Sequence, residues 1–161
     1  MEPIQKEFLK ILADYQGIIH KVNLIYFKSA MDKQDNFQEI VYQLWKAFPS
    51  LKNTDKLASW IYAVAINTSI SKVRKDCRLE FHESVAGFTD QVPAQEEEDN
   101  RQIQRLFAAL YELNEIDKSV MLLYMEDYSY KEIAAITGIG VSNVGVKIHR
   151  LKNQLQKRLN G

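Results

Sequence analysis

The stretch YSYKEIAAITGIGVSNVGVKIHRLKNQLQKRLNG, from Tyr128 to Gly161, contains two apolar helical patterns separated by a short glycine-containing break. The first pattern ends at Thr137, and Gly138 follows where a left-handed helix cap is needed. The second begins after Gly140, and its apolar residues step by three and four: Val141, Val144, Ile148, Leu151 and Leu155. Two helices joined by a turn of about three residues, with the small Ala134 at their crossing, predict a helix-turn-helix.

The outer face of the second helix carries polar and basic side chains. Its members are one or three positions apart and so share one side of a helix: Ser142, Asn143, Val146, Lys147 and Arg150. Short polar groups near the start of such a helix reach base edges, and cations further along, including Lys152, neutralise phosphates. After Gly140 every charged residue is basic. The alternative, a solvated basic helix that ends a bundle, leaves the glycine turn unexplained.

The rest of the chain shows helical periodicity and no alternating strand pattern, so the predicted fold class is all-α. Charge divides it into three blocks: residues 1–78 carry a net +4, residues 79–100 a net −7, and residues 101–161 a net +3. The middle block contains a Gly, a Pro and the acidic run 96–99, which is typical of a linker. We therefore expect two small helical domains, 1–78 and 101–161, joined by an acidic linker over 79–100.

The composition argues against several classes of protein. No apolar run approaches the roughly 18 residues that span a bilayer, and the polar start MEPIQKEFLK does not resemble a signal peptide, so we expect a cytoplasmic protein. A single cysteine and three scattered histidines give neither a disulfide nor a zinc site. With no phosphate-binding loop or catalytic triad pattern either, the sequence predicts no metal, no cofactor and no small-molecule substrate.

Three segments together resemble a known family. The stretch from Tyr128 to Leu155 resembles the promoter-recognition region of bacterial sigma factors, in particular the small extracytoplasmic-function group. DNFQEIVYQLWKAF, residues 35–48, resembles that family's D-L-V-Q-E-V-F-x-x-L-W helix. WIYAVAINTSISKVRK, residues 60–75, resembles its W-L-Y-x-I-A-x-N-x-x-x-D-x-L-R-R segment. The three segments follow the family order, with the acidic linker between the two blocks, so the resemblance covers most of the chain.

The resemblance implies a factor that binds core RNA polymerase and reads two elements of promoter DNA, without being an enzyme itself. Three sets of site residues follow from matching positions. Those matching the polymerase-binding helix are Asp35, Gln38 and Glu39. Those matching the part that opens and reads the downstream element are Asn53, Lys56, Tyr62, Asn67, Lys72, Arg74 and Lys75. Those expected at the upstream element are Lys131, Ser142, Asn143, Val146, Lys147, Arg150 and Lys152.

Family members are often held inactive by an anti-sigma protein, so the resemblance makes such a protein a candidate partner and leaves open whether one exists. Gly145 and Val146 depart from the family pattern, which usually has a longer polar residue at the first position and a small polar residue at the second. These departures leave the promoter sequence open. One alternative is a stand-alone helix-turn-helix regulator, which would bind an operator by itself, usually as a dimer. Another is a helical enzyme, for which no convergent set of catalytic groups is present.

Overall fold

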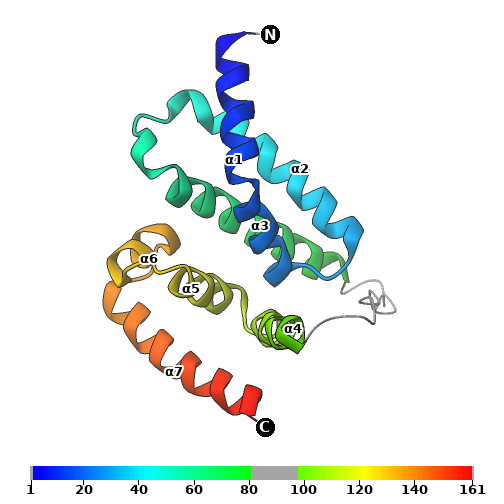
Figure 1. The fold of residues 1–161 in the computed structure, drawn as a ribbon, viewed down its shortest axis with the longest axis vertical. Helices are drawn as coiled ribbons and strands as arrows, with labels where there is room; N and C mark the ends of the chain where they lie inside the picture. The colour runs from blue at the N-terminus through cyan, green and yellow to red at the C-terminus, as the bar shows by residue number, and fades with distance from the viewer. Residues whose placement is uncertain (1, 81–97, 161) are drawn as a thin grey trace. The chain divides into compact units, whose positions relative to one another are not determined.

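The computed structural model describes residues 2–80 and 98–160, and all regular elements in these two ranges are helices (Figure 1). The all-α prediction is therefore confirmed. The chain divides into two compact units, Met1–Phe88 and Thr89–Gly161, each with its own apolar core. Within the described ranges, no helix is both long enough and apolar enough to cross a membrane.

The first unit contains α1 (Pro3–Tyr26), α2 (Ala30–Ala47), two short 3-10 turns η1 (Phe48–Ser50) and η2 (Thr54–Lys56), and α3 (Leu57–Glu80). Pro3 occupies the first turn of α1, where a missing N–H costs nothing. Ser29 caps α2, because its Oγ accepts a hydrogen bond from the backbone N–H of Asp32 at 3.0 Å. Pro49 lies where α2 gives way to η1, since proline cannot continue a helix.

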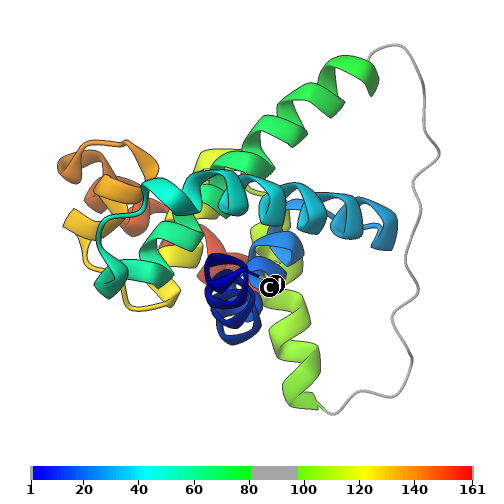
Figure 2. The same ribbon diagram turned by 90° about the horizontal axis from the view of Figure 1, so that it is seen from above.

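The three helices of this unit all pack against one another. Figures 1 and 2 show them gathered round one core, with α1 seen nearly end-on in the second view. Its fully buried side chains come from all three helices: Ile19, Val22, Ile25, Ile40, Leu44 and Ile66. This burial removes apolar surface from water and is the main stabilising contribution to the unit.

A polar network crosses the same core. The side-chain amide of Asn36 on α2 donates to Asn23 Oδ1 on α1 (2.8 Å) and to Ser69 Oγ on α3 (2.9 Å). Asn23 Nδ2 in turn donates to the Lys33 carbonyl at 3.0 Å, and the Ser69 hydroxyl donates to the Ala65 carbonyl at 2.7 Å. Asn36 and Ser69 are 0% exposed, so these bonds satisfy groups that have left water. One amide thereby ties all three helices together.

The second unit contains α4 (Glu98–Tyr111), α5 (Glu115–Met125), α6 (Tyr130–Thr137) and α7 (Val141–Asn160). Helix α7 packs against each of the other three. Its buried residues are Val144, Ile148, Leu151 and Leu155, as the periodicity predicts. Val141, expected on the same stripe, is 46% exposed. Because helical side chains lean toward the N-terminus, the first residue of α7 covers the preceding turn and not the core.

The helices extend into both ends of the range predicted as a linker. Helix α3 continues through Leu79 and Glu80, and α4 begins at Glu98. Residues 81–97 lie outside the described residues, and the central part of the linker prediction lies there with them.

Candidate nucleic-acid interface

Helices α6 and α7 form the helix-turn-helix that the sequence predicts. A capping box starts α6: Ser129 Oγ accepts from the Glu132 N–H at 3.2 Å, and Glu132 Oε1 accepts from the Ser129 N–H at 3.0 Å. Gly138 ends it with φ of 80°, and its N–H donates to the Ala134 carbonyl at 2.9 Å. The predicted left-handed cap is thus confirmed. The chain then re-enters a helix at Val141, which makes α7 the candidate recognition helix.

The outer face of α7 brings together the residues that the sequence placed there. Ser142 and Asn143 are exposed in its first turn, and Arg150 and Lys152 are exposed further along. Val146 lies between these polar and basic groups and is 68% exposed. Lys131, the remaining predicted residue from α6, is exposed as well. This face therefore offers short hydrogen-bonding groups, one aliphatic group and several cations to a ligand.

Two cations of α7 are held by a carboxylate from another helix. Lys147 Nζ lies 2.9 Å from Asp117 Oδ1, and Arg150 NH2 lies 3.2 Å from Asp117 Oδ2. The Asp117 side chain, at the start of α5, is only 6% exposed, whereas those of Lys147 and Arg150 are 28% and 52% exposed. Sequence reasoning missed this residue, because helical periodicity relates positions within one helix and gives no signal for a contact between residues 117 and 150.

Gly145, in the second turn of α7, lies next to Tyr130 of α6. A Cβ added at this position would lie 3.4 Å from Cε2 of Tyr130, the first residue of α6. That distance is an ordinary van der Waals contact, so packing against the Tyr130 ring does not require glycine at this position. Lys152 makes a further contact to an aromatic residue, with Nζ 3.2 Å from the Tyr124 hydroxyl.

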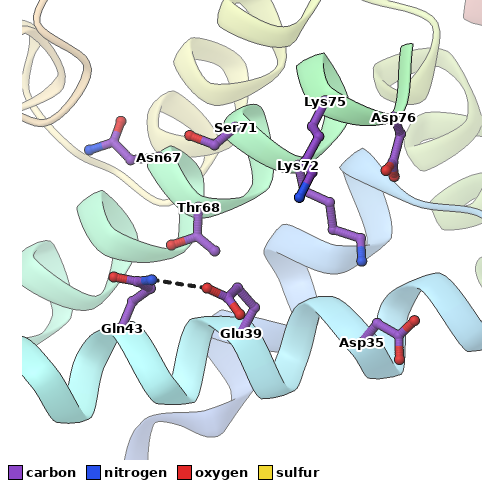
Figure 3. Close-up of a pocket in the computed structure, with 9 residues that line it drawn as sticks. All are labelled: Asp35, Glu39, Gln43, Asn67, Thr68, Ser71, Lys72, Lys75 and Asp76. Carbon is purple, nitrogen blue, oxygen red and sulfur yellow. Dashed lines mark hydrogen bonds between the residues drawn. The ribbon is translucent and has the colours of Figure 1, made fainter. Parts of the chain in front are cut away.

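In the first unit, a polar groove of about 800 Å³ lies between α2 and α3 (Figure 3). Helix α2 contributes Asp35, Glu39 and Gln43 to its wall, and Gln43 Nε2 donates to Glu39 Oε1 at 2.9 Å. The wall from α3 consists of Asn67, Thr68, Ser71, Lys72, Lys75 and Asp76. Cys77, the one cysteine of the chain, follows Asp76 and is exposed.

Residues predicted for two different partners meet in this groove. Asp35 and Glu39 come from the predicted polymerase-binding set, whereas Asn67, Lys72 and Lys75 come from the predicted downstream DNA set. The groove thus has two carboxylates on its α2 wall, and two ammonium groups together with the carboxylate of Asp76 on its α3 wall. Sequence matching treated the two sets as separate sites, because it does not bring α2 and α3 together.

The remaining predicted residues lie outside the groove lining. Gln38, Lys56 and Arg74 are exposed. Asn53 is also exposed, and its Oδ1 accepts from the Asp55 N–H at 3.0 Å, which caps η2. Tyr62 requires a correction: it is 3% exposed, so its ring offers no face to an unpaired base. It lies on the buried side of α3 with Ile61, Ala65 and Ile66, where aromatic rings on helices usually pack.

Comparison with known proteins adds independent information. The family model described as Sigma-70 region 2 matches residues 11–78, and the one described as Sigma-70, region 4 matches residues 103–155. The first match covers most of α1 to α3, and the second covers most of the helical unit that contains α6 and α7.

Individual proteins resemble the chain over most of its length. RNA polymerase sigma factor SigV of Bacillus subtilis is 25% identical over 140 residues, which are 86% of this chain and 82% of that protein. RNA polymerase sigma factor YlaC of the same organism is 26% identical over 132 residues, or 78% and 76% of the two chains. ECF RNA polymerase sigma factor SigE of Mycolicibacterium smegmatis is 28% identical over 135 residues, 80% of this chain and 52% of that one.

A solved structure has the same fold. It is the sigma factor RpoE of Bartonella quintana in complex with the anti-sigma factor NepR, with a TM-score of 0.71 and 19% identity. The match covers 99% of this chain and 98% of the other.

Proposed function

The chain belongs to the extracytoplasmic-function group of sigma-70 factors, and on that basis we propose how its residues divide the work of transcription initiation. It is a sigma factor, which binds core RNA polymerase and directs promoter recognition. The proposal concerns the residues that carry out each step. It rests on the exposed face of α7 and on the groove between α2 and α3.

In the second unit, α7 reads the upstream promoter element. Ser142 and Asn143 in its first turn hydrogen-bond to base edges in the major groove, with Val146 beside them. Phosphates are bound by the cations of the two helices: Lys131, Lys147, Arg150 and Lys152. The single observation that carries this assignment is the exposure of short polar groups at the start of a helix whose opposite face is buried.

In the first unit, the two walls of the groove have different partners. Asp35 and Glu39, with Gln38 nearby, bind a basic surface of the polymerase. On the other wall, Asn67, Lys72 and Lys75 contact the separated downstream strand, together with Arg74, Asn53 and Lys56. We leave Tyr62 out of this set because it is buried. The half-buried Lys72 and the exposed Lys75 on α3 suit a strand whose backbone carries one negative charge per nucleotide.

The remaining assignments follow from family membership. The chemistry of RNA synthesis belongs to the polymerase, so this chain is assigned no catalytic reaction and no small-molecule substrate. Because the polymerase works on chromosomal DNA, we place the protein in the cytoplasm. The structurally similar RpoE is complexed with an anti-sigma factor, and we propose a partner of that kind for this chain.

Run-off transcription tests the assignment of α7. Core polymerase plus this protein should initiate from a discrete set of promoter fragments, and Ser142→Ala with Asn143→Ala should abolish those transcripts. Gln156→Ala, an exposed change near the end of the same helix, is the matched control and should preserve them. An absence of protein-dependent transcripts, together with tight duplex binding by the protein alone, would instead establish a stand-alone regulator.

A further inference from the structure

Asp117 is a buried carboxylate to which no step of promoter recognition has been assigned. Its two oxygens have three partners: Lys147 Nζ at 2.9 Å, Arg150 NH2 at 3.2 Å and Asn114 Nδ2 at 3.0 Å. We propose that Asp117 is a positioning residue, which holds the two central cations of α7 at fixed places before DNA arrives. This proposal rests on α7 being the DNA-reading helix.

The carboxylate is anchored in α5 independently of α7. Asn114 is the N-cap of α5, and its Oδ1 accepts from the Asp117 N–H at 2.8 Å while its Nδ2 donates to Asp117 Oδ2. The start of a helix also favours negative charge, because the peptide N–H groups there have no helical partner. Asp117 is thus a fixed point on which the flexible side chains of Lys147 and Arg150 converge.

The cations can keep this contact while they bind DNA. A guanidinium has five N–H donors and an ammonium has three, so one bond to Asp117 leaves donors for a phosphate or a base edge. Arg150 is 52% exposed at its side chain and faces solvent beyond the ion pair. Because the two side chains are already ordered, DNA binding costs less conformational entropy than it would if both side chains moved freely in solvent.

Asp117 also limits indiscriminate attraction to DNA. Two positive charges share one negative charge, so this part of α7 presents a net +1 where free cations would present +2. Attraction to phosphates is independent of sequence and grows with each cation that is free to neutralise one. Pairing with a carboxylate therefore lowers the affinity for non-specific DNA more than it lowers the affinity for the matched sequence.

A purely structural role makes different predictions. If Asp117 only joined α5 to α7, its replacement would lower the stability of the second unit and leave the DNA properties of the folded protein unchanged. If it positions the cations, replacement changes the dependence on salt and the discrimination between sequences.

The test compares Asp117→Asn with Asp127→Asn in the full-length chain bound to core polymerase. Asp127 is exposed in the turn before α6 and has φ of 67°, a conformation that asparagine accepts readily. Its replacement raises the net charge of the second unit by one, as Asp117→Asn does, and so serves as the control. Binding is measured between 50 and 200 mM salt, a range chosen because phosphate contacts respond strongly across it, on promoter DNA and on DNA with a scrambled upstream element. For Asp117→Asn we expect a slope of log affinity against log salt that is steeper by about 1, and discrimination lower by roughly tenfold.

If Asp117→Asn does not fold, the same comparison is made in a Lys147→Met background, where one cation fewer is left beside the neutral amide. There, adding Asp117→Asn should again lower discrimination, now through Arg150 alone. Salt slopes and discrimination equal to those of the matched backgrounds would overturn the positioning role. Wild-type holoenzyme that binds both DNA sequences equally would overturn the assignment of α7 itself, and the role of Asp117 with it.

Discussion

Val146 is an aliphatic side chain that stays 68% exposed on an otherwise polar face of α7. It lies one turn after Ser142 and one turn before Arg150, in the part of the helix proposed to enter the major groove. The apolar feature of that groove is the C5 methyl group of thymine. We therefore expect Val146 to contact a thymine methyl in the upstream element.

Replacing thymines by uracil, one position at a time, tests this contact. At one position the affinity of the holoenzyme should fall about fourfold, because burying one methyl contributes about 0.8 kcal/mol. Val146→Ala should bind both forms equally, whereas Val141→Ala, at the start of α7, should keep the wild-type sensitivity. Equal binding of every uracil-substituted promoter by the wild-type protein would contradict the contact.

Helix ends and helix faces could be predicted from the sequence because their causes are local. Gly138 supplies the positive φ with which α6 ends, and Pro49, which lacks an N–H, follows the end of α2; both effects come from the residue itself. The apolar spacing of α7 likewise placed Ser142, Asn143 and Arg150 on its outer face. These features decide the fold class and the upstream part of the candidate site.

Contacts between helices could not be predicted in the same way. From the sequence, Asn36 is only a polar residue within a helical segment. The packed core shows that its side-chain amide forms hydrogen bonds with Asn23 and Ser69. Asp117 and the shared groove of α2 and α3 were missed for the same reason. The assignment of Tyr62 to the DNA-contacting set was wrong, because matching a family position did not reveal that the ring is buried in the core.

The Asn36 network should control the stability of the first unit. Asn36→Ala removes the donor to the buried Asn23 Oδ1 and leaves the Ser69 hydroxyl with its bond to the Ala65 carbonyl alone, and we expect a loss of about 1 to 3 kcal/mol in the free energy of unfolding. Both tryptophans, Trp45 and Trp60, lie in this unit, so their fluorescence during urea denaturation reports its unfolding.

Gln34→Ala, an exposed change on the same helix, is the control and should shift the midpoint by little. If Asn36→Ala shifted the midpoint no more than Gln34→Ala, the network would contribute nothing measurable.

Over the entire chain, positive and negative charges balance, with 21 basic and 21 acidic residues. A neutral protein exerts little long-range attraction on DNA, so binding depends on local groups such as Lys72 and Lys75. Asp35 and Glu39 line the same groove and repel the phosphates that these lysines attract. A polymerase surface that neutralised the two carboxylates would therefore strengthen DNA binding on the opposite wall.

Removing the two carboxylates should have opposite effects on the two partners. Asp35→Asn with Glu39→Gln should raise the affinity of the isolated chain for single-stranded downstream DNA about fivefold at low salt, and lower its affinity for core polymerase. Glu7→Gln with Asp14→Asn, two exposed changes on α1, is the control and raises the net charge by the same amount. Fluorescence anisotropy measures both affinities, and parallel changes for the two partners would refute the opposition of the two walls.

Cys77 is placed so that a label attached to it can report on binding in the groove between α2 and α3. It is the one thiol in the chain, it is exposed, and it directly follows a residue of the groove wall. A maleimide dye will therefore attach at one known place without any engineered cysteine. Its emission will report separately on the arrival of the polymerase and of the DNA strand, and so give the order in which the two partners bind.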